Sequence, residues 1–271
     1  MAVPLTHAPR TLVLMYHRIG ISLNAWERKY CVSPNQFVKH MKALAHAGYQ
    51  ACSLDAFMAW MNGIADLPDR AFLLTFDDGY QSLYTHVAPV LAKLGWPVTV
   101  FLVSSLIGKT DVWCQAENPD ERSYPLISAS EIRELAECGF TFQSHTWSHA
   151  DLTTLSDEAL DRELTGSRES LEALLGKPVR FLAYPYGRHN DHVVEMTRAA
   201  GYFAAFSVRP GFNRRGQDFF RIRRLDVFGG DSTAGLLRKM SLGSNDGTML
   251  TRARYYIERL TANRKRTSSD E

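Results

Sequence analysis

Short apolar segments that alternate with helical patterns run through most of this chain, and they constrain its fold more than any other feature. These segments have the length and the β-branched or aromatic content of strands: residues 11–17, 71–76, 98–103, 140–145, 179–184, 202–208 and 223–228. Strand–helix alternation is typical of a parallel sheet with helical crossovers. Because about seven such repeats occur in one chain, we predict a single-domain α/β fold, a (β/α) barrel rather than an open sheet.

Helical segments between these strands carry recognisable start and stop signals. Residues 33–49 begin with Ser33 as the N-cap, and we expect this helix to end at Gly48. Residues 156–178 begin with Ser-Asp-Glu and stop at Gly-Lys-Pro by the same logic. Residues 128–140 predict a shorter helix of the same kind.

The overall charge and the lack of long apolar segments exclude several classes of protein. The chain has 31 Lys and Arg residues against 29 Asp and Glu residues, so its formal net charge of +2 is too balanced to suggest a nucleic-acid-binding protein. The N-terminal apolar run is too short for the core of a signal peptide, and no segment reaches transmembrane length. The four cysteines are scattered and form no CxxC pair, which fits reduced thiols. We therefore expect a cytoplasmic protein.

The end of the chain differs in composition from the rest. We expect residues 1–240 to form the catalytic domain, and residues 241–271 to form a linker, an amphipathic helix and a disordered tail. The linker is expected over residues 241–248 and the helix over residues 249–260. We expect this helix to pack on the domain rather than to bind a membrane or a partner.

Two adjacent acids follow one of the predicted strands. The segment TFDDG places Asp77 next to Asp78, directly after residues 71–76. Like charges repel, so this pair is costly unless a cation lies nearby or one acid is protonated. A simple Asp-Gly turn with no catalytic or binding role accounts for the same sequence pattern. At the end of a strand, however, side chains stop alternating between the two faces, so both carboxylates can reach one site.

Two histidines that are four residues apart follow another predicted strand. The segment SHTWSH places His145 and His149 so that one helical turn brings both imidazoles to the same side. A catalytic zinc site uses three imidazole or carboxylate ligands and leaves a position for water. One of the two acids would complete that set with His145 and His149, and the other acid would then lie near a metal-bound water as a general base. The same three ligands also match the iron oxygenases, which stay open as an alternative.

A third motif, LAYPYG at residues 182–187, ends a further strand. Tyr184 and Tyr186 supply aromatic faces, and Pro185 fixes the turn. Aromatic walls with a few polar donors suit a sugar ring, and a fixed backbone N–H suits an oxyanion. Taken alone, such a turn is more often only structural.

The motifs TFDDG, HTWSH and YPYG, in this order, resemble the first three motifs of the polysaccharide deacetylases, the NodB-homology domains of carbohydrate esterase family 4. The resemblance covers residues 11–228 and implies a distorted, often seven-stranded (β/α) barrel. It implies that Asp77 is the catalytic base. It implies a divalent metal, usually Zn²⁺, held by three ligands: Asp78, His145 and His149. It also implies that Pro185 and Tyr186 line the sugar groove and that the backbone N–H of Tyr186 contributes to an oxyanion hole.

The chain departs from the family pattern in the third motif. Family members commonly carry an Arg two residues before the Pro, where it orients the base, and Ala183 stands there in this chain. The segment FFRIRRLDV at residues 219–227 offers a substitute. We expect Arg224, rather than Arg221 or Arg223, to replace the missing Arg that orients the base. The alternative for each of the three is an arginine on the surface without this role.

The second departure concerns the acid that protonates the leaving amine. The usual Leu-x-His motif near the C-terminus cannot be present, because no histidine follows His192. His17 ends the first predicted strand, and this placement resembles a circularly permuted branch, similar to the poly-N-acetylglucosamine deacetylases, in which the strand that carries the acid comes first. A barrel tolerates this permutation because its first and last strands are neighbours. We interpret the other histidines as structural or solvated: His7, His40, His46, His86, His189 and His192.

From these residues we predict a metal-dependent hydrolase that removes the acetyl group from an N-acetylated sugar in an oligosaccharide, a polysaccharide or a glycoconjugate. We expect Zn²⁺ as the cofactor, with Co²⁺, Ni²⁺ and Mn²⁺ as alternatives. We expect no nucleic-acid partner, and membrane association only if the C-terminal helix provides it. The alternatives are a catalytically silent carbohydrate-binding module of the same fold and an iron(II)-dependent oxygenase that uses the same ligands.

Overall fold

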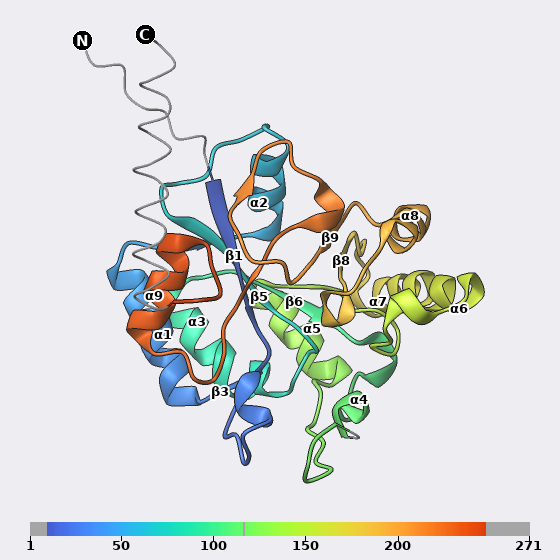
Figure 1. The fold of residues 1–271 in the computed structure, drawn as a ribbon, viewed down its shortest axis with the longest axis horizontal. Helices are drawn as coiled ribbons and strands as arrows, with labels where there is room; N and C mark the ends of the chain where they lie inside the picture. The colour runs from blue at the N-terminus through green and yellow to red at the C-terminus, as the bar shows by residue number, and fades with distance from the viewer. Residues whose placement is uncertain (1–9, 116, 248–271) are drawn as a thin grey trace.

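A curled sheet of parallel strands forms the centre of the molecule (Figure 1). The computed structural model describes residues 10–115 and 117–247. The sheet is built in the order β10, β1, β5, β6, β7, β8, β9, and β11 also pairs with β1. One further parallel strand, β4 (Gln50–Cys52), pairs with β5 and was not predicted from the sequence. The other seven occupy the positions expected for them: β1 (Arg10–Tyr16), β5 (Ala71–Phe76), β6 (Val98–Leu102), β7 (Phe140–Ser144), β8 (Phe181–Ala183), β9 (Ala204–Phe206) and β11 (Leu225–Asp226). The last three are shorter than the sequence predicts.

The segment before β11 brings the two edges of the curled sheet together. Phe206 of β9 forms a parallel bridge with Ile222, and three residues later β11 pairs with β1. The first and last parallel strands of the chain are therefore neighbours, as expected for a distorted seven-stranded barrel with a permuted order. A short strand, β10 (Asn213–Arg214), adds to the other end of β1 in the antiparallel direction.

Alternating side chains of the strands form two apolar cores. One face of the sheet packs against the surrounding helices, through residues such as Leu12, Leu14 and Phe72. The other face points into the barrel, where Val13 and Leu73 pack with members of four further strands and with one helix. That helix is α2 (Leu54–Met61), which was not predicted from the sequence. It follows the short strand β4 (Gln50–Cys52) and fills the N-terminal end of the barrel, so the C-terminal ends of the strands are left for the site.

The outer helices confirm the start and stop signals of the sequence. Helix α1 (Pro34–His46) begins after the N-cap Ser33, whose side chain accepts a hydrogen bond from the backbone N–H of Gln36, and Gly48 follows its end with φ of 79°. The capping box of Ser128 and Glu131 starts α5 (Ala129–Glu137). The remaining outer helices are α3 (Ala88–Leu94), α8 (Asp191–Ala199) and α9 (Thr233–Leu242).

The helix expected over residues 156–178 is interrupted. It consists of α6 (Asp157–Asp161), a π-helical turn η5 (Arg162–Gly166) and α7 (Ser167–Leu175). It ends at Gly176, which adopts a left-handed conformation with φ of 63°. The expected helix and its stop signal are therefore confirmed, and the π turn within it was not predicted.

The structure describes the start of the segment that was expected to be a linker. Helix α9 continues to Leu242, so the first two residues of the expected linker are helical. Asn245 donates a hydrogen bond to Asp226 and accepts one from its backbone N–H, which ties the segment after α9 to β11. The amphipathic helix expected over residues 249–260 and the tail after it lie outside the described residues. Among the residues that the structure describes, no helix is long and apolar enough to cross a membrane.

Candidate active site

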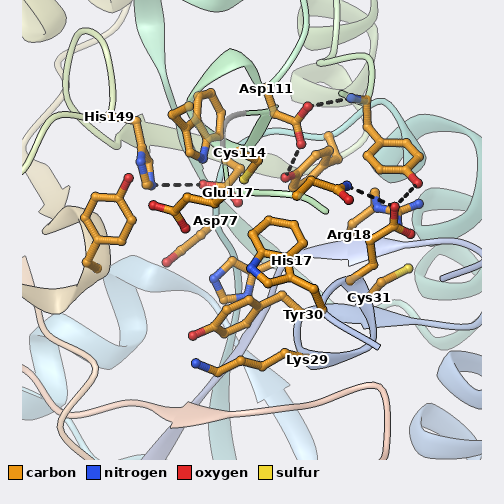
Figure 2. A pocket seen from close by; sticks show the side chains of 18 of the residues that line it. His17, Arg18, Lys29, Tyr30, Cys31, Asp77, Asp111, Cys114, Glu117 and His149 are labelled. Atoms are coloured by element: carbon orange, nitrogen blue, oxygen red, sulfur yellow. Dashed lines mark hydrogen bonds and ion pairs between the residues drawn. The ribbon is translucent and has the colours of Figure 1, made fainter. Parts of the chain in front are cut away.

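The C-terminal ends of the strands surround a cavity of about 590 Å³. Figure 2 shows its wall, with His149 and Asp77 on one side of the view and His17 beside Tyr30. The sequence-predicted residues that border this cavity are His17, Asp77, Asp78, His145, His149, Tyr184 and Tyr186. Helix α4 (Val112–Gln115) and the loop around it form another part of the wall.

Asp78, His145 and His149 form one compact cluster. The Oδ1 atom of Asp78 lies 3.5 Å from Nε2 of His145 and 3.5 Å from Nε2 of His149. One ligand atom from each residue lies within 4.8 Å of the other two, and all three residues are buried. Within residues 10–115 and 117–247, this is the one group of three or more His, Cys, Asp or Glu side chains with such spacing.

The protonation states of this cluster suit a cation. The Nδ1 atom of His145 lies 2.8 Å from the carbonyl oxygen of Ala183, which can only accept, so Nδ1 carries the proton and Nε2 presents its lone pair. Burial lowers the pKa of His145 to about 4 and that of His149 well below its usual value, so both imidazoles are neutral. Burial, then Asp77 and Asp111, raise the pKa of Asp78. Its buried Oδ1 accepts no hydrogen bond from the described residues. Neutral imidazoles around an unsatisfied carboxylate oxygen are the ligand set that Zn²⁺ prefers.

Asp77 lies beside this cluster and is held by Arg224. The guanidinium donates two parallel hydrogen bonds, from Nη1 to Oδ1 at 2.6 Å and from Nη2 to Oδ2 at 2.8 Å, and its Nε donates to the carbonyl oxygen of Ser207 at 2.9 Å. Arg224 is fully buried. Burial alone would raise the pKa of Asp77, but Arg224 outweighs it and holds the pKa at about 2. The structure thus brings Arg224 to the acid, whereas Arg221 pairs with Asp218 near the surface.

The backbone after β5 explains why two adjacent acids face one site. Asp77 continues the inward alternation of Leu73 along the strand, and its N–H donates to the carbonyl oxygen of Tyr16. Asp78 then adopts a left-handed conformation with φ of 71°, which turns its side chain toward the histidines. Gly79 follows with φ of 77°, and a Cβ atom there would lie 2.5 Å from a methyl carbon of Leu102, so only glycine fits.

His17 borders the cavity at the end of β1. Its ring packs against Tyr30 with the ring centroids 4.7 Å apart, and its buried Nδ1 has no hydrogen-bond partner among the described residues. Burial lowers the pKa of His17 to about 4, while Asp77 opposes this effect, and Arg224 and Lys29 add to it. The imidazole is therefore neutral in the free cavity.

The residues of the third motif separate into two groups. Tyr186 is 42% exposed and contacts His149 edge to face, with the centroids 4.7 Å apart, so its ring can meet a substrate. Pro185 is buried and outside the cavity wall, where it starts the 3₁₀ turn η6 (Pro185–Gly187). Tyr184 is fully buried and stacks on His189, so its ring supports the turn rather than offering a free face.

Other residues of the cavity wall were not predicted from the sequence. Trp113 of α4 stacks on His149 with the centroids 4.5 Å apart. Glu27 accepts hydrogen bonds from Arg18, Asn118 and Tyr124, which joins the segment after β1 to the loop after α4. These residues lie in loops and short elements away from the ends of the predicted strands, so no periodic signal could have found them.

A protein-family model for polysaccharide deacetylases matches residues 65–205 of this chain. YxkH of Bacillus subtilis, which is assigned to the polysaccharide deacetylases, is 27% identical over 230 residues, which cover 84% of this chain and 75% of YxkH. The poly-β-1,6-N-acetyl-D-glucosamine N-deacetylase of Staphylococcus aureus is 24% identical over 217 residues, which cover 73% of this chain and 71% of that enzyme.

A solved structure shares the fold. The deacetylase PplD of Streptococcus pyogenes superposes with a TM-score of 0.73 at 21% identity, and the match covers 86% of this chain and 99% of PplD. The family match spans more than half of the chain and includes both acids, both histidines and the third motif. The chain therefore belongs to the polysaccharide deacetylase family, whose members are hydrolases that act on carbon–nitrogen bonds other than peptide bonds.

Proposed function

We propose that this protein is a metal-dependent deacetylase that hydrolyses the N-acetyl group of an N-acetylated sugar in a glycan or glycoconjugate. The observation that carries the proposal is the position of Asp77. An acid that Arg224 keeps ionised lies next to a buried ligand set, with its Oδ2 atom 3.9 Å from Nε2 of His145. A family member that only bound sugar would not need this buried ionised acid.

Asp78, His145 and His149 would hold the metal. When bound, a divalent ion such as Zn²⁺ polarises a carbonyl group and lowers the pKa of a bound water toward about 7. Asp77 then accepts the proton of the attacking water, since Arg224 keeps the carboxylate ionised at every pH above about 2. The backbone N–H of Tyr186 is our candidate donor to the developing oxyanion.

His17 is the proposed acid for the leaving amine. Because the pKa of the neutral ring is about 4, the proton that His17 donates has to arrive during the reaction, and Asp77 is the nearby charge that favours the imidazolium. His17 and Asp77 border the same cavity. The base and the acid are thus separate residues from two neighbouring strands, β5 and β1.

The cavity suits a sugar ring more than a peptide. Exposed or half-buried aromatic rings border it, namely Trp26, Tyr30, Trp113, Tyr124 and Tyr186. Aromatic faces with a few polar donors are the usual lining of a carbohydrate site. A relative acts on poly-β-1,6-N-acetyl-D-glucosamine, and we propose a glycan that contains N-acetylglucosamine as the substrate.

The test compares two groups of variants with Zn²⁺ added. Asp77→Asn should reduce acetate release from an N-acetylglucosamine oligomer by at least about 10²-fold, because the proton acceptor is lost, and the zinc content should stay close to that of the wild type. Asp78→Ala, His145→Ala and His149→Ala should instead lose the bound zinc. Equal loss of zinc in both groups would contradict the assignment of roles.

A separate variant tests the acid. His17→Ala should lower kcat by about 10²-fold or more with little change in zinc content. An unchanged kcat would remove His17 from the mechanism.

A further inference from the structure

The loop that carries His149 has an unusual backbone. Thr146 and His149 both adopt a left-handed conformation, with φ of 69° and 67°, and neither is a glycine. Such conformations are unfavourable for residues with a side chain and persist only where the surroundings hold them. The neighbouring protein groups must therefore fix this loop.

One side chain, Glu163, accepts hydrogen bonds from the middle of the loop. Its Oε2 accepts from the backbone N–H of Trp147 at 3.0 Å and from that of Ser148 at 2.9 Å. Its Oε1 accepts from the hydroxyl of Ser148. Glu163 is only 7% exposed, and in the described parts of the chain no Lys, Arg or His forms an ion pair with it. Its buried carboxylate is therefore satisfied by the loop that it holds.

The loop makes other hydrogen bonds, but among the described residues none of them uses the backbone N–H groups of Trp147 and Ser148. The backbone N–H groups of Ser104 and Ser105 donate to the carbonyl oxygens of Thr146 and Trp147, at 3.1 and 3.0 Å. The N–H of His149 donates to the hydroxyl oxygen of Thr146 at 3.2 Å. Without Glu163, the N–H groups of Trp147 and Ser148 would lose their acceptor, and the residue directly before His149 would be released.

The π-helical turn η5 explains how Glu163 reaches the loop. The turn lies between α6 and α7, within the helix that the sequence predicts over residues 156–178. The indole of Trp147 lies beside Gly166 at the end of the turn, 3.6 Å from where a Cβ atom would be, which is an ordinary van der Waals distance. Single π turns inside helices occur frequently at functional sites, where they redirect a side chain.

We propose that Glu163 is a positioning residue for the metal site: it holds the loop between His145 and His149 so that both Nε2 atoms face Asp78 before the metal binds. This inference rests on the proposed function, since it needs the metal site. Groups outside the ligands that orient them typically contribute 10–100-fold to metal affinity.

The test measures the zinc affinity of the full chain by competition with a chromophoric chelator, and it records the visible spectrum of the Co²⁺-substituted protein. Glu163→Ala should weaken zinc binding by about 10-fold or more and should change the Co²⁺ spectrum. Glu163→Gln should retain most of the affinity, because its amide oxygen can still accept from both backbone N–H groups.

Glu172 of α7 provides the matched control. Its Oε1 accepts a hydrogen bond from the backbone N–H of Val179 at 3.0 Å, on a segment away from the metal ligands. Glu172→Ala should therefore lower the melting temperature of the metal-free protein without changing the zinc affinity or the Co²⁺ spectrum.

The outcomes separate this inference from the proposed function. If the wild type fails to bind zinc, the proposed metal site is wrong, and the inference is wrong with it. If the wild type binds zinc and Glu163→Ala binds it equally well, only the inference is overturned. Should Glu163→Ala not fold, Glu163→Asp carries the same expectation, because a side chain shorter by one methylene cannot reach both backbone N–H groups.

Discussion

Arg224 determines the charge of the site at the scale of single residues. It is the fully buried partner of Asp77, and it arrives from the segment leading into β11 rather than from the third motif, where Ala183 packs in the inner core. A buried carboxylate without a cation is protonated in preference to being charged. The two parallel hydrogen bonds therefore keep Asp77 both ionised and oriented.

This pair leads to a prediction about stability. Arg224→Met should lower the free energy of unfolding by about 3–5 kcal/mol, because Asp77 is left buried and unpaired. The double variant Arg224→Met/Asp77→Asn should lose less than the single variant, since no uncompensated charge remains. Urea denaturation of the metal-free proteins measures both values. A double variant that loses the sum of the two single effects would contradict this account.

Lys29 influences the pKa of His17 across the cavity wall. Its positive charge is one of the causes that lower this pKa. An acid must be protonated to act, so kcat falls as the pH rises through the pKa that His17 has in the enzyme–substrate complex. Lys29→Met removes a charge that opposes protonation, and the pKa of His17 should rise. The alkaline limb of the kcat–pH profile should therefore move to higher pH, and added salt should reduce the difference between variant and wild type.

Lys93→Met is the control for this prediction, because Lys93 lies in the last turn of α3 and is not part of the cavity wall. Its profile should match that of the wild type. If only the low-pH side of the kcat–pH profile shifts in Lys29→Met, Lys29 does not act on His17, the proposed acid.

At the scale of elements, the site is built from strand ends with left-handed residues. Asp78 and Gly79 follow β5, Thr146 and His149 follow β7, and Tyr186 follows β8, and all of them have positive φ. Each of these turns redirects the chain from the strand so that a side chain faces the cavity. Each of these backbone conformations is unfavourable for a residue with a side chain. Several of them occur together around this cavity, as is typical of sites where backbone strain positions reactive groups.

Gly79 provides the prediction for this scale. Gly79→Ala should lower the free energy of unfolding by about 1–3 kcal/mol and weaken zinc binding, because a methyl group strains the backbone and displaces Leu102. Gly95→Ala is the matched control, since Gly95 has φ of 62° but no atom lies within 4 Å of the position that an added methyl group would take. It should cost less stability and leave zinc affinity unchanged. Equal effects of the two changes on zinc binding would contradict a role for the turn after Asp78.

At the scale of the whole molecule, the barrel leaves only one end open for chemistry. Helix α2 fills the N-terminal end, and the segment from Ile222 to β11 joins β9 to β1. The residues proposed as metal ligands follow β5 and β7, which are distant in the sequence, so their spacing depends on the folded barrel. Metal binding and folding should therefore be linked.

Zinc should stabilise the folded protein through this linkage. At a free zinc concentration 100 times the dissociation constant, the free energy of unfolding should increase by about 2.7 kcal/mol. Urea denaturation with and without buffered zinc measures the change, and Asp78→Ala is the control that should show almost none of it. Equal stabilisation of the wild type and of Asp78→Ala would place the bound zinc elsewhere on the chain.

Much of this arrangement could be predicted from the sequence because it depends on local patterns. Strand–helix alternation indicates the barrel, and the acids and histidines directly follow predicted strands, whose C-terminal ends meet at one face. The helix signals at Ser33 and Gly176 are confirmed for the same reason, since caps are determined by neighbouring residues. The position of Arg224 at the last predicted strand makes it a candidate from the sequence. Its contact with Asp77 depends on the fold and is seen only in the structure.

The sequence by itself determined which strands exist and which reactive side chains stand at their ends, because hydrophobic periodicity and capping act over a few residues. Only the tertiary structure decided what surrounds those side chains. The insertion of α2, the stacking of Trp113 on His149 and the contact of Glu163 with the ligand loop depend on packing between segments far apart in the chain. No local pattern encodes such contacts, because each arises from the way the curled sheet brings loops together.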